Sequence, residues 1–508
     1  MARKAKNATK LAEKGSAGLP KDWLISEHSS PRFAKDGSKL YFGTQTPPIV
    51  KDTTLLPEEI VSVDVWHWQD ARLQSQQAAE LEADKKRFYL AVAYPKGRRL
   101  VQLGSPEVPT VMTGNEGNAE LALGISEEPY LRTTSWMGYP PYRDIYIINY
   151  RDGRKTKVKE KLRASVSLSP QANYLCWYAP ADSAWFSYSI RNGQTHNLTQ
   201  KLPAKFYDEL HDVPDAPSSY GAMGWTENDQ SFLVYDRFDI WQFDPENRSP
   251  AQRITQNGRE NSIAYRYVPV DPEQKFIKVN EPLILETFDE ETKAGGYFSL
   301  NLSRNEPPRK LIFDDALFRD LKKAKNAGKY VFTRQTFTDF PDLYYTDATF
   351  TKINRISQAN PQQASYYWGT SELVHWVAPN GDKLSGILYK PETFDPGKKY
   401  PMITYFYERL SDRLHQHYAP QPSRSTIRPS MYTSNGYLVF IPDIPYRVGY
   451  PGRSAYEAVI SGVTKLLEDD FVDENKLGIQ GQSWGGYQWP ISLPNQSLCS
   501  RYGRRSSV

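Results

Sequence analysis

Residues 476–486 read Lys-Leu-Gly-Ile-Gln-Gly-Gln-Ser-Trp-Gly-Gly, so a short apolar strand runs directly into the pattern Gly481-x-Ser483-x-Gly485. This pattern is typical of a nucleophile elbow, a tight turn between a strand and a helix that presents a serine hydroxyl outside the sheet. The flanking glycines let the backbone pass close to its neighbours. The same pattern also arises by chance in glycine-rich loops, so the preceding sequence must decide between the two interpretations.

The preceding sequence has the character of an α/β domain. Short apolar runs at 400–407 and 437–443 predict buried parallel strands. Residues 454–470 carry apolar side chains at helical spacing, and Ser454 with Glu457 predicts a capping box at the start of that helix. Together with the strand before Ser483 they form a strand-helix-strand unit, which is expected to be right-handed. In this context we interpret Ser483 as a catalytic nucleophile.

Residues 30–347 have a different character, with short runs of alternating aromatic or β-branched residues. Turn signals separate these runs and predict antiparallel hairpins; they are Asp36-Gly37, Asp152-Gly153 and Asn192-Gly193. A shared pattern of a turn followed by a strand recurs in three segments and favours a β-propeller over a β-sandwich. The three segments are residues 30–42, 165–178 and 223–235.

The predicted fold is therefore an all-β propeller followed by an incomplete α/β-hydrolase domain. The propeller covers residues 1–360, is expected to be incomplete at its N-terminus, and carries a helical insertion near 73–86, which is rich in Gln, Ala, Glu and Leu. Strand patterns on both sides of a turn at 379–382 place the start of the second domain near 365, and it extends to 508. Two prolines in 489–494 are expected to break the helix that should follow the elbow, so 489–508 is predicted to be an aberrant tail.

Composition excludes several classes of function. The 63 basic and 59 acidic residues are balanced and dispersed, so no nucleic-acid partner is expected. Cys176 and Cys499 cannot form a disulfide framework or a cysteine-based zinc site, and no metal or cofactor is predicted. No stretch approaches the roughly 18 apolar residues of a membrane span, and residues 1–14 lack the apolar core of a secretory signal. Cellular compartment and oligomeric state stay undecided.

Several blocks of the sequence resemble the prolyl oligopeptidase (S9) family of serine peptidases, in particular its dipeptidyl peptidases. The resemblance is specific from about 332 to 488 and loose over the propeller. It implies hydrolysis of short peptides after proline or another small residue, through an acyl-enzyme on Ser483. The similar blocks are residues 337–347, 360–363, 368–376, 442–454, 471–479 and 481–488.

The same resemblance implies two donors for the oxyanion that forms during attack. The residue that aligns with the family's oxyanion tyrosine is Tyr407, and the backbone amide of Trp484 would be the second donor. The alternative for Tyr407 is a core aromatic residue. Tyr405, further back in the strand, is the one expected to lie in the core. Adjacent acidic residues could hold the amine of a substrate, but Glu58-Glu59 and Glu127-Glu128 are candidates only by adjacency and are not assigned.

The acid and the histidine of a catalytic triad are absent. In α/β-hydrolases both follow the serine along the chain, yet residues 484–508 contain no Asp, Glu or His. His415 and His417 lie on a loop of the same domain and are interpreted as solvated. We therefore expect the literal chain to be inactive. All seven histidines precede the serine: His28, His67, His196, His211, His375, His415 and His417.

A truncation or frameshift close after Gln488 would explain the missing triad members. One synonymous spelling of residues 499–508 reads, one base later, as Ala-Ala-Ala-Met-Ala-Gly-Ala-Pro-Val, which resembles the next strand of the family. The genomic sequence downstream of Gln488 tests this hypothesis. The alternative function is a non-catalytic propeller that binds peptides or proteins and keeps a remnant of the hydrolase domain.

Overall fold

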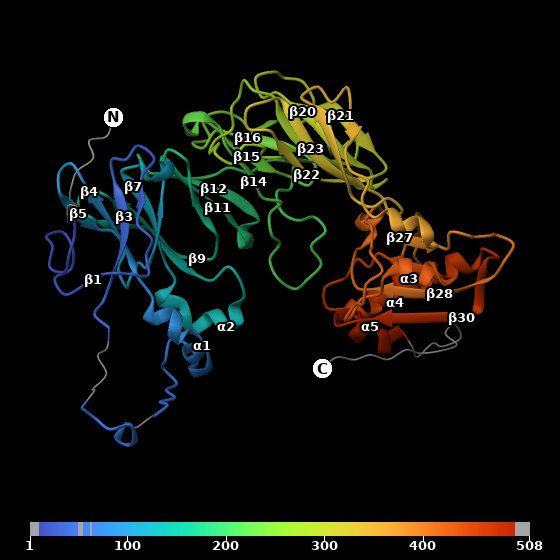
Figure 1. The fold of residues 1–508 in the computed structure, drawn as a ribbon, viewed down its shortest axis with the longest axis horizontal. Coiled ribbons are helices and arrows are strands. Elements are labelled where there is room, and N and C mark those ends of the chain that lie inside the picture. Colours follow the sequence, from blue (N-terminus) through green and yellow to red (C-terminus); the bar gives the residue numbers. More distant parts are fainter. Residues whose placement is uncertain (1–9, 49–53, 61–62, 493–508) are drawn as a thin grey trace. The chain divides into compact units, whose positions relative to one another are not determined.

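The computed structural model describes residues 10–48, 54–60 and 63–492 (Figure 1). The chain forms two compact units. The first comprises Met1–Phe206, Gly224–Leu233 and Phe243–Ala251, and the second comprises Tyr207–Met223, Val234–Gln242 and Gln252–Val508.

Three antiparallel sheets, each built from consecutive strands, make up most of the first unit. Core side chains connect neighbouring sheets: Tyr41 and Val92 of the first sheet pack with Ile148 of the second, and Leu123 of the second packs with Trp177 of the third. The first sheet contains β1 (Leu24–Ile25), β2 (Arg32–Phe33), β3 (Leu40–Gln45), β4 (Tyr89–Tyr94) and β5 (Arg99–Gln102); the second contains β6 (Thr110–Thr113), β7 (Leu121–Ser126), β8 (Arg143–Asn149) and β9 (Lys155–Leu162); the third contains β10 (Val166–Leu168), β11 (Tyr174–Ala179), β12 (Ala184–Ser189) and β13 (Thr195–Asn197).

The next three sheets repeat this plan. The division between the two units runs through the first of them, and the other two belong to the second unit. Tyr297 of one of these two sheets packs against Phe318 and Phe332 of the other. The strands are β14 (Ala222–Trp225), β15 (Phe232–Tyr235), β16 (Ile240–Phe243) and β17 (Gln252–Arg253); β18 (Ile263–Tyr267), β19 (Leu283–Asp289), β20 (Gly295–Leu300) and β21 (Arg309–Asp314); and β22 (Leu317–Lys323), β23 (Lys329–Gln335), β24 (Asp342–Asp347) and β25 (Asn354–Arg355).

The all-β character predicted for this part of the chain is confirmed. Gly37, Gly153 and Gly193 all have φ between 71° and 74°, as expected of glycines in the predicted turns. Each of the three repeated segments coincides with a strand pair of one sheet, namely β2 with β3, β10 with β11 and β14 with β15. Closure of the sheets into a propeller, and the domain boundary near 365, stay predictions.

Helices are few in this part of the chain. The predicted helical insertion is confirmed as α1 (Gln74–Lys85), which has no buried residue and is held by ion pairs from Arg72 to Glu80 and Asp84. The other short helices described in this part are α2 (Thr134–Met137) and the 3-10 helices η1 (Pro57–Glu59), η2 (Asn115–Gly117), η3 (Glu128–Thr133), η4 (Pro180–Asp182) and η5 (Glu227–Asp229); η6 (Pro361–Ser365) and η7 (Ser411–Arg413) follow later in the chain.

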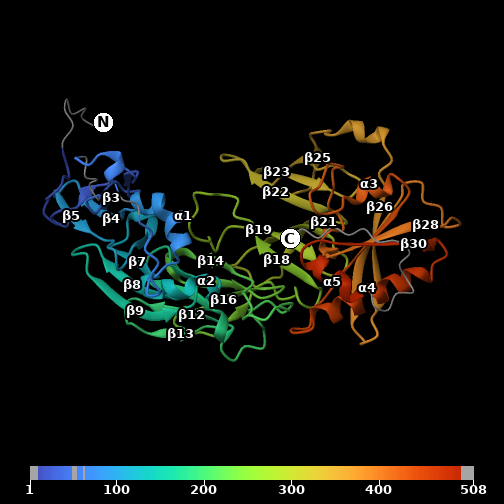
Figure 2. The ribbon, with the colours of Figure 1, turned by 90° about the horizontal axis from the view of Figure 1, so that it is seen from below.

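A mixed five-stranded sheet follows in the second unit, in the order β26-β27-β29-β28-β30. Strand β28 is parallel to both β29 and β30, as the apolar runs predicted, and β27 is antiparallel to β26 and β29. Helices α4 and α5 lie beside this sheet (Figure 2). The elements are β26 (Thr370–Val377), β27 (Lys383–Lys390), β28 (Tyr400–Phe406), α3 (Pro429–Thr433), β29 (Leu438–Pro442), α4 (Pro451–Leu467), β30 (Val472–Gly481) and α5 (Trp484–Ser492).

Both faces of this sheet bury apolar side chains. On one face, Met402 and Phe440 pack against Val459 of α4. On the other face, Tyr405 and Val439 pack against Ile427, which precedes α3. Burial on both faces explains why the parallel strands read as continuous apolar runs.

Two local predictions in this domain are wrong. Helix α4 begins at Pro451 instead of Ser454, because a proline at the first helical position has a suitable φ and no N–H to satisfy. The Ser454 hydroxyl therefore lies inside the helix, where it accepts from the Arg447 amide at 3.0 Å and donates to the Tyr450 carbonyl at 3.0 Å. The helix break expected at Pro490 is also wrong, since α5 continues through it to Ser492 and one proline removes a single backbone hydrogen bond. Pro494 and the rest of the predicted tail lie outside the described residues.

None of the described helices combines the length and the apolar character needed to cross a membrane.

Candidate active site

Ser483 occupies the turn between β30 and α5. Its φ is 52°, in the left-handed region that residues other than glycine enter at a cost, and its side chain is exposed. The Gly485 amide donates to the Gln482 carbonyl at 3.0 Å, and the Tyr487 amide donates to the Ser483 carbonyl at 3.0 Å, which closes the turn and starts the helix. The serine thus sits at the tip of a strained strand-to-helix bend, the geometry expected of a nucleophile elbow.

The two glycines of the motif have a steric role. A Cβ added to Gly481 would lie closer than 3.0 Å to the carbonyl of Gly485, and a Cβ added to Gly485 would lie closer than 3.0 Å to the carbonyl of Phe406. Backbone atoms cannot move aside as a flexible side chain can. The bend therefore packs directly against the end of strand β28, and this contact requires glycine.

Tyr407 follows β28 at this point of contact. Phe406 and Gly481 are paired in the register of β28 and β30, so the residues after them leave two adjacent strands at the same edge of the sheet. Tyr407 is half-buried, whereas Tyr405 is buried in the core as predicted. The residue that the resemblance singled out therefore lies next to the elbow.

The amide of Trp484 lies at the start of α5. The first N–H groups of a helix have no acceptor within the helix and carry the positive end of its dipole. An oxygen that becomes negatively charged beside Ser483 would meet this end of the helix. Indole packing fixes the position of Trp484, since its ring stacks on Tyr487 at 5.2 Å.

Tyr446, for which no role was predicted, connects Tyr407 with helix α5. Its hydroxyl donates to the backbone carbonyl of Tyr407 and accepts from Nε2 of Gln488 at 2.6 Å. Its ring meets the Trp484 ring edge-on at 5.8 Å. Burial raises the pKa of the Tyr446 phenol to about 12, so it stays protonated at neutral pH. A signal was present, because Tyr446 lies in the block 442–454 that resembles the family.

Carboxylates fix the segment that follows Tyr407. Asp443 is the main anchor: its Oδ1 accepts from the amides of Leu410 and Ser411 at 2.7 and 2.8 Å, and its Oδ2 accepts from the Ser411 hydroxyl. Burial nevertheless raises the pKa of Asp443 above its ordinary value. Asp412, one residue further, pairs with Lys293 at 2.8 Å.

Asp212 reaches the same segment from the loop 207–223 of the second unit. Its Oδ2 lies 3.1 Å from Nη1 of Arg409 and accepts from the Tyr446 amide at 3.1 Å. Arg409 also donates to the Leu210 carbonyl at 2.8 Å. Contacts at 407, 409, 410, 411 and 412 therefore hold the chain rigidly where it leaves β28.

The two nearby histidines are not solvated, and that prediction is wrong. His417 stacks on Trp368 at 4.7 Å and its Nε2 lies 3.0 Å from the side-chain oxygen of Gln363. Burial lowers its pKa to about 4, and burial also lowers the pKa of His415. The sequence of a loop shows that its residues are polar, but it does not show which tertiary contacts bury their side chains. Among the described residues, no histidine forms a hydrogen bond with the Ser483 hydroxyl.

Three of the four residues in the acidic pairs have partners. Glu127 forms an ion pair with Arg143 at 2.6 Å, and Glu128 lies 3.3 Å from Arg87. The Glu59 carboxylate accepts from the Leu56 amide at 2.8 Å. Within the described part of the chain, no group of three or more His, Cys, Asp or Glu side chains is placed to hold a metal ion.

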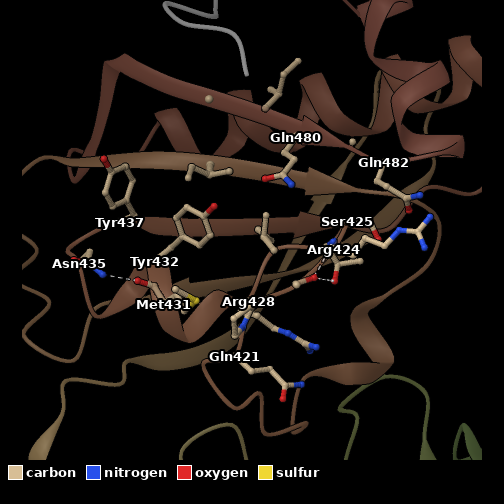
Figure 3. Close-up of a pocket in the computed structure, with 18 residues that line it drawn as sticks. Gln421, Arg424, Ser425, Arg428, Met431, Tyr432, Asn435, Tyr437, Gln480 and Gln482 are labelled. Atoms are coloured by element: carbon tan, nitrogen blue, oxygen red, sulfur yellow. Dashed lines mark hydrogen bonds between the residues drawn. The ribbon is translucent and has the colours of Figure 1, made fainter. Parts of the chain in front are cut away.

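A cavity of about 1100 Å³ opens beside β30 (Figure 3). Gln480 of the strand and Gln482 of the following turn border it, together with Met431 and Tyr432 of α3 and the guanidinium groups of the loop before α3. The lining is mixed, with apolar side chains and amides. Its residues are Ile403, 421–428, Met431, Tyr432, Asn435, Tyr437 and 478–482.

No protein-family model matches the chain. Its curated relatives include dipeptidyl-peptidase 5 of Porphyromonas endodontalis, which is 26% identical over 172 residues, or 31% of this chain and 24% of the relative. Human dipeptidyl peptidase 8 is 27% identical over 146 residues, or 25% of this chain and 15% of the relative. The chain is a relative of the S9 serine peptidases. The matched stretches cover less than a quarter of the length of these two relatives.

Solved structures of S9 peptidases share the fold. Dipeptidyl peptidase 4 of Porphyromonas gingivalis superposes with a TM-score of 0.55 at 12% identity, covering 92% of this chain and 73% of that one. A structure from Bacteroides ovatus described as a dipeptidyl aminopeptidase IV gives a TM-score of 0.53 at 13% identity, covering 92% and 68%. At such identities the likeness concerns the fold alone.

Proposed function

We propose that this chain is an S9 serine peptidase that hydrolyses short peptides through an acyl-enzyme on Ser483. The observation that carries the proposal is the strained bend at Ser483, packed by Gly485 against the end of β28 where Tyr407 begins. Strain at a non-glycine residue persists where the surrounding structure imposes it, and such positions cluster at active sites.

The proposed chemistry uses the groups at this bend. The Ser483 hydroxyl gives its proton to a base while Oγ bonds to the peptide carbonyl carbon, and negative charge develops on the carbonyl oxygen. The Tyr407 hydroxyl and the Trp484 amide would donate hydrogen bonds to that oxygen. The C–N bond then breaks, the amine leaves with a proton, and water hydrolyses the ester. Each such donor is worth about 3 kcal/mol of transition-state stabilisation.

The proposed architecture is a propeller over residues 1–360 and a hydrolase domain over 365–508. The six consecutive antiparallel sheets, three pairs of which share buried side chains, support the first part. The mixed sheet flanked by α4 and α5 supports the second. A propeller of this kind would restrict access to short peptides, and the family resemblance favours cleavage after proline or another small residue.

The proposed chemistry requires a base for the Ser483 hydroxyl. The described residues present no histidine to Ser483, and residues 484–508 contain no acidic residue or histidine. We therefore expect activity toward peptides to require a base from outside these 508 residues. An unactivated serine with intact oxyanion donors should still respond to a base supplied from solution, because oxyanion stabilisation alone leaves measurable residual catalysis.

Chemical rescue with imidazole tests the proposal on the 508-residue chain. The protein is incubated with a fluorophosphonate probe at increasing imidazole concentration, and the labelled residue is identified by mass spectrometry. We expect no labelling without imidazole, labelling of Ser483 that rises with imidazole, and none in Ser483→Ala. Equal labelling of the Ser483→Ala variant, or no labelling of Ser483 at any imidazole concentration, would overturn the nucleophile assignment.

The second candidate is a non-catalytic β-propeller that binds peptides or proteins. The observation that favours it is the serine without a base. Labelling of Ser483 under imidazole would argue against this candidate, because a remnant has no reason to keep a strained serine and its oxyanion donors functional.

A further inference from the structure

We propose that Tyr446 is a positioning residue that fixes the two oxyanion donors relative to each other. The inference rests on the proposed function, since it concerns Tyr407 and the Trp484 amide as donors. Tyr446 itself touches neither substrate nor nucleophile in the proposed mechanism. Its role would be to hold the end of β28 and the start of α5 at a fixed distance from each other.

The Tyr446 hydroxyl is the common point of the two elements. It donates its proton to the Tyr407 carbonyl on the β28 side and accepts from Gln488 on the α5 side. These bonds connect residues 39 and 42 positions apart along the chain, so no local structure provides the same link. The edge-on contact of its ring with Trp484 at 5.8 Å adds a second connection to α5.

The phenol hydroxyl of Tyr446 bonds both to the Tyr407 carbonyl and to the Gln488 side-chain amide. A phenol donates one hydrogen bond and accepts others, so it satisfies a carbonyl and an amide N–H together. Gln488 is fully buried, and its amide group would lose this acceptor if the hydroxyl were removed. The Phe variant keeps the ring and its packing on Trp484 but releases both hydrogen bonds.

Tyr446 is itself held in place. Its amide donates to Asp212, whose carboxylate also pairs with Arg409, two residues beyond Tyr407. The hydroxyl and the amide of Tyr446 are thus anchored to the same segment at two points. This arrangement restrains the carbonyl of Tyr407 and the direction of the chain that follows it. A donor displaced by about 1 Å can lose most of its effect on a reaction.

A double-mutant cycle on the imidazole-rescued labelling rate tests the proposal. Tyr446→Phe should slow labelling of Ser483 on the order of tenfold, while Tyr450→Phe, which alters a tyrosine that is 66% exposed in the same block, should leave the rate unchanged. In the Tyr407→Phe background, one donor is gone and the relative position of the two no longer matters. The effect of Tyr446→Phe should therefore shrink there.

Each outcome has a distinct meaning. If Tyr446→Phe labels at the wild-type rate, or slows labelling equally with and without the Tyr407 hydroxyl, Tyr446 is not a positioning residue. If wild type is not labelled at all, the proposed function fails, and hydrogen exchange then tests the link alone. Tyr446→Phe should increase exchange in both 405–412 and 482–490, with 457–465 of α4 unchanged; unaltered exchange in either of the first two segments overturns the proposal.

Discussion

Phe406 and Gly481 are paired in the register of the parallel strands β28 and β30, and each is the last residue of its strand. Parallel strands end at the same edge of a sheet, so Tyr407, which follows β28, and the bend with Ser483, which follows β30, leave the sheet at the same edge. Ligands of open α/β sheets bind outside the carboxyl ends of the strands. The candidate site of this chain therefore lies where such sheets generally place their chemistry.

Replacing Gly485 with alanine should destabilise the second unit. The new methyl group would lie closer than 3.0 Å to the Phe406 carbonyl, which is backbone and cannot rotate away. Overpacking of this kind costs about 1–3 kcal/mol. Gly486→Ala is the matched control, because the nearest atom to its Cβ is 3.6 Å away and alanine favours a helix. Thermal unfolding should show a lower midpoint for Gly485→Ala alone; equal midpoints would contradict the contact between the bend and β28.

Replacing Ser483 with glycine should stabilise the protein relative to Ser483→Ala. A residue with a side chain at φ 52° carries conformational strain of about 1–2 kcal/mol that glycine does not. The greater freedom of glycine in the unfolded chain offsets about 0.4–1 kcal/mol of this gain. Both variants lack the hydroxyl, so their comparison isolates the backbone. A midpoint of Ser483→Gly below that of Ser483→Ala would show that the bend is not strained.

His417 should make stability depend on pH between about 4 and 6.5. Burial lowers its pKa from 6.5 to about 4 in the folded state, so the unfolded state binds the additional proton within this window. Stability conferred by the neutral ring is therefore present above pH 6.5 and falls as the pH falls toward 4. His417→Gln removes the titrating group. Its unfolding midpoint, measured across this range, should vary less steeply with pH than that of wild type, and parallel profiles would refute the buried neutral histidine.

Removing Asp412 should cost more stability than removing a comparable surface carboxylate. Lys293 is 8% exposed and pairs with Asp412 at 2.8 Å, so after Asp412→Ala its remaining hydrogen-bond acceptor among the described residues is the Glu290 carbonyl. A loss of about 1–3 kcal/mol is expected for an uncompensated, largely buried charge. The control is Glu273→Ala, which breaks a fully surface pair with Lys325 at 3.1 Å and should change stability by less than about 1 kcal/mol. Similar losses for the two variants would mean that the Lys293 pair does not anchor the segment.

Local sequence patterns predicted much of the candidate site. The motif around Ser483 is contiguous, and a strand, a tight turn and a helix follow from neighbouring residues alone. The predictions of the glycine turns and of the helix at α1 also depended on neighbouring residues alone, and the structure contains both features. The capping box at Ser454 failed although it is also local, because Pro451 competes for the helix start and the pattern does not rank the two signals.

Other features depended on contacts between distant residues. The role of Tyr446 is visible only once its hydroxyl is seen between Tyr407 and Gln488, and the burial of His417 only once Trp368 is seen beneath its ring. The anchoring by Asp212 brings together residues 234 positions apart. A polar residue in a predicted loop produces the same sequence pattern whether its side chain is solvated or buried. The sequence alone therefore could not distinguish solvated from buried side chains.

The sequence by itself determined where the strand-to-helix turn with Ser483 lies, because the strand, the glycines and the helix that form it are contiguous in the chain. Tertiary structure alone decided which side chains hold that turn against the neighbouring strand. Hydrogen bonds and burial at such points arise from segments that meet only after the sheet has formed, and the free energy of those contacts is not encoded in any single stretch of the chain.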